Sequence, residues 1–522
     1  MHRACSPLAL VVAATGWLAG CTGDPHPLLV MDDDDDAEAY EPTSELLVDP
    51  DLAVHFVAEL ADFWIVARDD EAGGFFSFVE QDGSVGSQRD KSLVVQSRDA
   101  YGFARAFMLT GDDAYLDHAG HALDFLTTHG WDEEYGGWYF GTDEHGELVS
   151  LFDEDWDPNS FKWSFTQHYA LVGPAAMCEV TRDADACGWL EAGIEVLDEG
   201  LWDTDPQRVG YYDRAELDWS QPSGKGFTPT VDAFTTHARQ AFLLNGDADL
   251  EARLLALADN MADHLVGSAG LEAVELGFPE VYDSDWDIDG SATISQPGHV
   301  LKTAWCLADA HAVDPGAGYD QDARELVRDM LDNGGYDGAF GGPLYEVDWS
   351  TGAVTSDAKV YWVLEQGVTA GLTSYHLADD PGDRDDFLRM ADESLDFYLT
   401  HLVDRDDGET WSTVSRDGDE VLDAAKGDAF KGAYHSIELG YYTYLYGKLW
   451  VAEEAVTLFY RFEPVDTPRE FVLDPLPVPA GALNIAEVTL DGEPFGSFEG
   501  ETRTLQLEAG VGGIFRVTFA PE

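Results

Sequence analysis

Apolar residues recur at helical spacing along most of the chain, between residues 46 and 457. Leu116, Ala119, Leu123 and Leu126 are separated by 3, 4 and 3 positions, which is the apolar face of an amphipathic helix. Glycine-containing turns follow such helices at intervals of 63 to 74 residues, beginning at Gly73, Gly136, Gly210, Gly277, Gly341 and Gly408. Six units of two helices each predict an all-α (α/α)6 barrel, a toroid of six helical hairpins, with an open solenoid as the alternative.

The pattern changes after residue 457. Short runs rich in β-branched and aromatic residues, separated by Pro, Gly and Asp, replace the helical spacing. These runs are 458–462, 469–473, 485–490, 504–507 and 514–519. They predict a small β domain over residues 458–522, in which we identify no group of catalytic side chains.

Residues 1–20 have the organisation of an export signal. Arg3 precedes an apolar run over 8–18, and a Leu-Ala-Gly-Cys sequence ends at Cys21. This segment resembles a bacterial lipoprotein signal peptide and is too short to span a bilayer. The resemblance implies an exported lipoprotein of the outer membrane or cell surface, with Cys21 as its lipid anchor; a plain secretory signal is the alternative. Residues 21–45 include five consecutive Asp and predict an acidic tether.

The charge balance limits the possible partners. The chain has 102 Asp and Glu against 28 Lys and Arg, a net charge of −74. Such a surface repels phosphate backbones and anionic bilayers, so we expect no nucleic-acid partner and membrane contact only through the lipid anchor. The excess of acidic residues fits either adaptation to high salt, where ions screen the self-repulsion, or an ordinary acidic secreted protein.

The cysteines give no sign of a metal or redox centre. The sequence contains no C-x-x-C pair, so there is no thiolate zinc motif and no thioredoxin-type motif. Cys178 and Cys187 lie close in sequence, and an exported protein permits a disulfide between them.

Polar and aromatic side chains occupy one position of the repeat, near the start of a predicted helix in each unit. They are Arg98, Gln167, His237, His299, Trp362 and His435. A closed toroid would project one of them inward from each unit, forming a ring at one mouth. Histidine can remove or deliver a proton near neutral pH, and arginine stabilises an oxyanion. This set favours proton abstraction beside a carbonyl through an enediolate.

Several motifs at the same positions are more specific. They are Trp131-Asp132, Tyr135-Gly136-Gly137-Trp138-Tyr139, Pro297-Gly298-His299 and Lys431-Gly432-Ala433-Tyr434-His435. Over about residues 50–455 the chain resembles the N-acylglucosamine 2-epimerase family, which includes cellobiose 2-epimerases and mannose isomerases. The resemblance implies an (α/α)6 fold and epimerisation or isomerisation at C1–C2 of a reducing-end sugar. It implies no metal and no redox cofactor.

The same resemblance implies the role of each candidate residue. His299 and His435 would be the acid/base pair at C2, His237 would assist ring opening, and Arg98 would stabilise the enediolate. The partner is a small carbohydrate, such as N-acylglucosamine, mannose, glucose or a disaccharide. We expect it to contact Trp362, Gln167, Tyr101, Trp138 and Trp411.

Two positions depart from the family pattern. Where the family often has Glu, three residues after Gly-His and four after Trp, this chain has Lys302 and Gln366. Glu365 adjoins Gln366 but points about 100° around the helix, so we expect no simple replacement. A carboxylate raises the pKa of a neighbouring histidine and a lysine lowers it, which leaves the substrate and the pH optimum open.

Two other functions compete with a sugar epimerase or isomerase. One is an (α/α)6 glycoside hydrolase or polysaccharide lyase, although glycoside hydrolysis usually requires two carboxylates about 5–9.5 Å apart. The other is a non-catalytic carbohydrate-binding surface lipoprotein that retains the barrel. Incorporation of deuterium at C2, cleavage of an oligosaccharide, or binding alone would distinguish the three.

Overall fold

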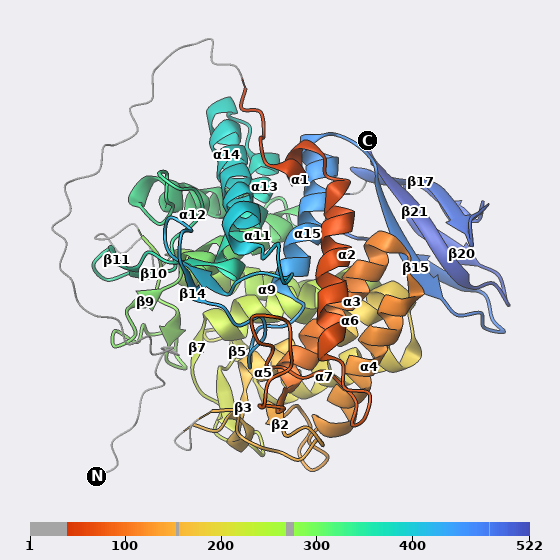
Figure 1. The fold of residues 1–522 in the computed structure, drawn as a ribbon, viewed down its shortest axis with the longest axis horizontal. Coiled ribbons are helices and arrows are strands. Elements are labelled where there is room, and N and C mark those ends of the chain that lie inside the picture. The colour runs from red at the N-terminus through yellow and green to blue at the C-terminus, as the bar shows by residue number, and fades with distance from the viewer. Residues whose placement is uncertain (1–38, 153–155, 268–275, 480) are drawn as a thin grey trace.

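The computed structural model describes residues 39–152, 156–267, 276–479 and 481–522. Its largest part consists of helices packed in pairs (Figure 1). In the described chain the inner helices are α3 (Leu93–Thr110), α6 (Val172–Thr181), α8 (Arg239–Asn245), α11 (Pro297–Val313), α13 (Tyr361–Leu377) and α15 (His435–Tyr446). Their outer partners are α2 (Leu52–Trp64), α4 (Asp113–His129), α7 (Ala184–Gly200), α9 (Ala248–Asn260), α12 (Tyr319–Asn333) and α14 (Pro381–Phe397).

The helical region closes on itself between its two ends. The first long helix, α2, packs against the last, α15, and α15 also packs against α3 (Figure 1). At this junction a Cβ on Gly102 would lie only 1.9 Å from the carbonyl oxygen of Ala433. Only glycine permits so close an approach of two backbones.

Inner and outer helices follow different sequence rules. The inner helix α3 is buried on every face from Leu93 to Leu109, as expected of a helix inside the core. The outer helix α12 buries one stripe, made of Tyr319, Ala323, Leu326, Val327 and Met330. Several outer helices begin at an aspartate that accepts a backbone N–H of the first turn, namely Asp112, Asp183, Asp247 and Asp380.

Short antiparallel strands connect neighbouring units at the end of the barrel where the inner helices begin. The pairs are β1 (Lys91–Ser92) with β2 (Gly141–Thr142), β3 (Phe161–Trp163) with β6 (Arg214–Glu216), β7 (Lys225–Gly226) with β8 (Val281–Tyr282), β9 (Ile294–Ser295) with β10 (Glu346–Asp348), and β12 (Lys359–Val360) with β13 (Thr413–Val414). Val79 pairs with Gly427, just before α15, so the connections run around the whole ring. The other strands in this region are β4 (Trp202–Asp203), β5 (Gly210–Tyr211), β11 (Ala353–Ser356) and β14 (Val421–Asp423).

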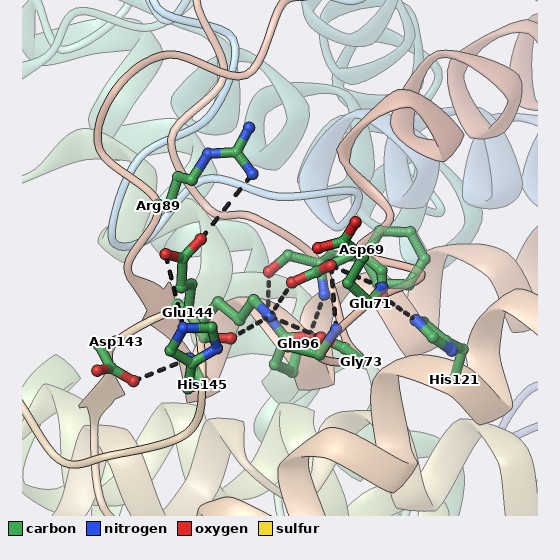
Figure 2. Close-up of polar contacts among 12 residues, drawn as sticks. Asp69, Glu71, Gly73, Arg89, Gln96, His121, Asp143, Glu144 and His145 are labelled. Atoms are coloured by element: carbon green, nitrogen blue, oxygen red, sulfur yellow. Dashed lines mark hydrogen bonds and ion pairs between the residues drawn. The ribbon is translucent and has the colours of Figure 1, made fainter.

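A buried lysine–aspartate pair recurs in these turns. In the first turn the Lys91 ammonium contacts Asp69 at 2.7 Å and donates to the carbonyl oxygens of Gly73 and Glu144. Figure 2 shows Asp69, Gly73 and Glu144 drawn together in this cluster. The same pair occurs as Lys162–Asp132, Lys225–Asp203, Lys359–Asp337 and Lys426–Asp404. The ammonium groups of Lys91, Lys162, Lys225 and Lys359 also donate to backbone oxygens, so these lysines fix the turns that lead into inner helices.

The predicted C-terminal strands are present. One antiparallel sheet has the order β15 (Val456–Phe462), β21 (Gly513–Pro521), β17 (Leu483–Leu490) and β18 (Glu493–Pro494). The other has the order β16 (Arg469–Val472), β20 (Thr504–Leu507) and β19 (Phe498–Glu499). Alternate residues of β15 are buried, and β15 packs against α3 and α6 beside the helical region (Figure 1).

Several details complete the description. The short helices are α1 (Glu45–Val48) and α5 (Ser164–Tyr169), and Cys178 and Cys187 form a disulfide between α6 and α7. The predicted signal peptide, Cys21 and most of the acidic tether lie outside the described residues. Within the described ranges, none of the helices combines the length and the apolar character needed to cross a membrane.

Candidate active site

Two histidines begin inner helices at the same end of the barrel. His299 lies in the first turn of α11, which starts at Pro297, and His435 is the first residue of α15. The ring of Trp362, at the start of α13, has its centroid 5.1 Å from that of His299 and 6.2 Å from that of His435. Because α13 packs against both α11 and α15, three helix starts bring these side chains together.

Glu280 and Phe227 hold the His299 ring. Oε2 of Glu280 lies 2.9 Å from Nδ1 of His299, and Phe227 stacks on the imidazole with centroids 3.8 Å apart. A carboxylate oxygen is an acceptor, so this contact suits the tautomer with its proton on Nδ1, which leaves Nε2 for a substrate. The side chain of His299 is 23% exposed, so solvent reaches it. The sequence analysis missed Glu280, which lies 19 residues before His299, directly ahead of β8.

His435 is buried beside two carboxyl groups. Its Nδ1 lies 3.3 Å from Oε2 of Glu365 and 3.8 Å from Oε2 of Glu438. Burial lowers the pKa of His435 well below its usual value, and the positive charges of Arg98 and Lys302 lower it further. Burial also raises the pKa of Glu365 and of Glu438. His435 is therefore neutral at pH 7 and is suited to accept a proton.

The position of Glu365 corrects an expectation from the sequence. The 100° offset from Gln366 turns Glu365 toward α15, where it reaches His435. Gln366 instead accepts a hydrogen bond of 2.6 Å from the indole N–H of Trp305 and donates to Glu365. The packing of α13 against α15 decides this contact.

Lys302 is paired rather than free. Its ammonium lies 2.7 Å from Asp232 and 3.1 Å from the hydroxyl of Tyr169. Burial lowers the pKa of Lys302, but the negative charge of Asp232 more than offsets this effect and raises it above the usual value. Lys302 thus stays charged and lowers the pKa of His435, Glu365 and Glu438.

The same charge bears on whether a metal ion fits here. Ligand atoms of Glu365, His435 and Glu438 lie within 4.8 Å of one another, close enough to share an ion. However, the protonated Lys302 acts on all three groups and opposes a second cation. The donor set therefore fits proton transfer better than divalent metal binding.

Arg98 supplies a positive charge that no carboxylate neutralises among the described residues. Its guanidinium lies over the ring of Tyr169, at 4.0 Å from the centroid, and 5.4 Å from that of Tyr434. One nitrogen donates to the carbonyl oxygen of Phe430, while Nε is buried without a partner. An arginine held in this way is available to an anion or an oxyanion.

An aromatic cluster lies beside Arg98, and the sequence analysis did not identify it. Its members are partly exposed rings in mutual contact, namely Phe152, Trp156, Trp163, Phe165 and Phe430. The guanidinium of Arg98 lies 5.5 Å from the Phe165 ring. Flat apolar faces beside a polar site suit the stacking of sugar rings.

His237 makes its contacts away from the other two histidines. Its Nε2 lies 3.0 Å from Nδ1 of His168, and the Tyr211 ring is 6.3 Å from its own. Burial, together with the smaller effect of the positive charge of Arg253, lowers the pKa of His237 to about 3. His237 belongs to consecutive π-helical turns, Thr228–Asp232 and Phe234–Ala238, whose wider turns change the direction of later side chains.

The remaining predicted contact residues lie at different depths. Tyr101 is buried below the histidines and donates to Glu438 at 3.0 Å. Gln167 bonds both backbone groups of Trp138, whose ring is only 2% exposed. Trp411 is partly exposed under the ammonium of Lys426, 3.7 Å from its ring centroid. The structure therefore brings together Arg98, His299, Trp362 and His435, with Tyr101 in the layer beneath them.

The fold and the site together consist of a ring of helix pairs with two histidines against carboxyl groups, an arginine without a carboxylate partner among the described residues, and partly exposed aromatic rings. The model of the N-acylglucosamine 2-epimerase (GlcNAc 2-epimerase) family matches residues 73–438. The chain belongs to this family and is thus an enzyme of the isomerase class. The resemblance seen in the sequence motifs is confirmed.

Named relatives are similar over most of their length. A cellobiose 2-epimerase of Eubacterium cellulosolvens is 22% identical over 399 residues, 72% of this chain and 93% of the relative. A D-mannose isomerase of Marinomonas mediterranea is 22% identical over 399 residues, 74% of this chain and 94% of the relative. A crystal structure of a D-mannose isomerase superposes with a TM-score of 0.67 at 21% identity, covering 76% of this chain and 98% of that structure.

Proposed function

We propose that this protein is a sugar 2-epimerase or aldose–ketose isomerase that acts at C1–C2 of a reducing-end sugar. The observation that carries the proposal is the pair of histidines, each with Nδ1 against a carboxyl group and Nε2 left for the substrate. Epimerisation removes the C2 proton from one face of the sugar and returns a proton to the other. Two bases on different helices meet this requirement.

The charge of each residue determines the step of the reaction that we assign to it. His435, neutral because it is buried near two cations, removes the C2 proton. His299, hydrogen-bonded to Glu280, delivers a proton to the opposite face, or the proton returns to C1 when a ketose forms. Arg98, whose guanidinium lies over aromatic rings and has no carboxylate partner among the described residues, stabilises the negative oxygen of the enediolate. We assign His237 only a supporting role, since its contacts are with His168.

Two features support a substrate larger than a monosaccharide. The aromatic cluster beside Arg98 offers several faces for a second sugar ring. Relatives that match this chain over 93% and 96% of their own length are named cellobiose 2-epimerase. We infer that a reducing disaccharide is a substrate, with mannose or glucose as the smaller alternatives.

The experiment is an exchange screen in deuterated water. The protein is incubated with mannose, glucose, N-acetylglucosamine and cellobiose, and deuterium at C2 is measured by NMR. We expect C2 exchange together with the 2-epimer or the ketose. The variant His435→Gln serves as the negative control, and absence of exchange with every sugar would refute the proposed activity.

We also infer the architecture and location around this site. The helix pairs form an (α/α)6 toroid over residues 46–457, followed by the β domain over 458–522. Cys21 carries a lipid that anchors an exported chain, with 21–45 as an acidic tether. If Cys21→Ser leaves the protein in the detergent phase of a membrane extract, the anchor assignment fails.

A further inference from the structure

Glu280 contacts both His299 and the start of the helix that carries it. Oε1 accepts a hydrogen bond of 2.6 Å from the backbone N–H of Gln296, the residue before α11. Oε2 lies 2.9 Å from Nδ1 of His299. The first N–H groups of a helix have no partner within it, and a negative charge is favourable there. One carboxylate therefore ties the imidazole to the helix start.

The backbone of Glu280 is fixed as well. Its carbonyl oxygen accepts from the N–H of Phe227 at 3.0 Å, and a Cβ on Gly226 would lie 2.1 Å from that oxygen. This contact joins β7 to β8, so the ribbon that carries Glu280 also carries Phe227, which stacks on His299. The β7–β8 ribbon therefore holds the imidazole of His299 at its edge through Glu280 and on its face through Phe227.

We propose that Glu280 is the positioning residue for His299: it keeps the proton on Nδ1 and presents Nε2 to the substrate. The proposal rests on the proposed function only for its kinetic part, because the tautomer of His299 is a property of the free protein. Both oxygens of the carboxylate accept hydrogen bonds, and the Gln296 N–H can only donate. Any side chain that replaces Glu280 must therefore offer an acceptor to the backbone N–H of Gln296, because that group cannot change its role.

This constraint gives the variant Glu280→Gln a specific outcome. The amide oxygen takes the N–H of Gln296, which leaves the amide NH₂ facing Nδ1 of His299. Nδ1 must then accept, so the proton moves to Nε2. An analogous exchange of acid for amide behind a catalytic histidine lowers turnover by about 10⁴-fold through the wrong tautomer. We expect kcat to fall by about 10²-fold or more with KM within about 2-fold, since Glu280 does not touch the substrate.

The measurement is ¹⁵N NMR of histidine-labelled protein, with the His299 signals assigned by their loss in His299→Gln. The matched control is Glu346→Gln, because Glu346 lies near enough to Glu280 for the two charges to interact but makes no contact with His299 among the described residues. We expect Nδ1–H in the wild type and in Glu346→Gln, and Nε2–H in Glu280→Gln. Glu280→Asp, which keeps both acceptors, should restore Nδ1–H.

The two proposals fail in different ways. A wild-type spectrum with the proton on Nε2 overturns the positioning role without any variant, as does an unchanged tautomer in Glu280→Gln. A tautomer switch without C2 exchange in the wild type supports the role of Glu280 and counts against the epimerase alone. A fall in kcat with the tautomer unchanged overturns the positioning role.

Discussion

The surroundings of His299 and His435 differ in charge and in access to solvent. His299 is partly exposed, lies between two aromatic rings and meets one carboxylate that also binds a helix start. His435 is only 7% exposed and lies between Glu365 and Glu438, near two cations. In the proposed function, two identical side chains at equivalent helix starts thus have opposite tasks because their neighbours differ. The helical repeat places each histidine at the start of an inner helix. The neighbours that differ between the two repeats set the charge and the exposure of each histidine.

Replacing each histidine in turn is the strongest test of the difference proposed between His299 and His435. His435→Gln and His299→Gln should each lower epimerisation by about 10²–10⁴-fold, the usual contribution of a general acid or base. If His435 removes the first proton, His299→Gln retains C2 exchange while His435→Gln loses it. Both rates are followed by NMR in deuterated water. The control is His264→Gln, since His264 stacks on Trp286 elsewhere in the barrel. Equal loss of exchange in both variants contradicts the division of tasks.

If Arg98 stabilises the enediolate between the two proton transfers, as proposed, its replacement should slow both directions equally. Loss of one oxyanion donor costs about 3–4 kcal/mol, or about 10²–10³-fold in kcat. We expect this loss in Arg98→Met and a smaller one in Arg98→Lys. The check is kcat for each direction together with the melting temperature. A change in only one direction would contradict the assignment.

The cation beside His435 offers a milder test. Removing the Lys302 charge raises the pKa of His435, because that charge lowers it. A base must be neutral to act, so the acid limb of the kcat/KM profile should move to higher pH. The double variant Lys302→Met with Asp232→Asn leaves no unpaired charge in the core. If the double variant folds and the acid limb of its kcat/KM profile does not move, then a group other than His435 determines that limb.

Of these changes, added salt should alter the activity of the site least. It should clearly raise the melting temperature, because it screens the charges on the surface. Raising salt from 0.1 to 1 M shortens the screening length from about 10 Å to about 3 Å. With a net charge of −74, we expect the melting temperature to rise. Buried pairs are screened much less, so the limb that reports on His435 should stay where it is. A melting temperature independent of salt would argue against adaptation of this surface to high salt.

The sequence predicted the parts of the site that the repeat specifies. The inner helices all start at one end of the barrel, and this brings together Arg98, His299, Trp362 and His435. The regular spacing of these residues along the chain was enough to place each of them near a helix start. Glu280 escaped prediction because β7 and β8 bring it to His299 from another turn. Glu365 was misjudged because its contact depends on the packing between α13 and α15. His237 lies in π-helical turns, where a count based on 3.6 residues per turn fails.

The lysine–aspartate pairs of the turns have a consequence for the outside of the molecule. All eight lysines of the chain are buried, with at most 8% of any one exposed. The surface is therefore built from carboxylates, a few guanidinium groups and neutral residues, and it offers no primary amine from a side chain. An amine-selective reagent should label these side chains only as the fold opens. The rate of lysine modification therefore reports directly on the rate at which the fold opens.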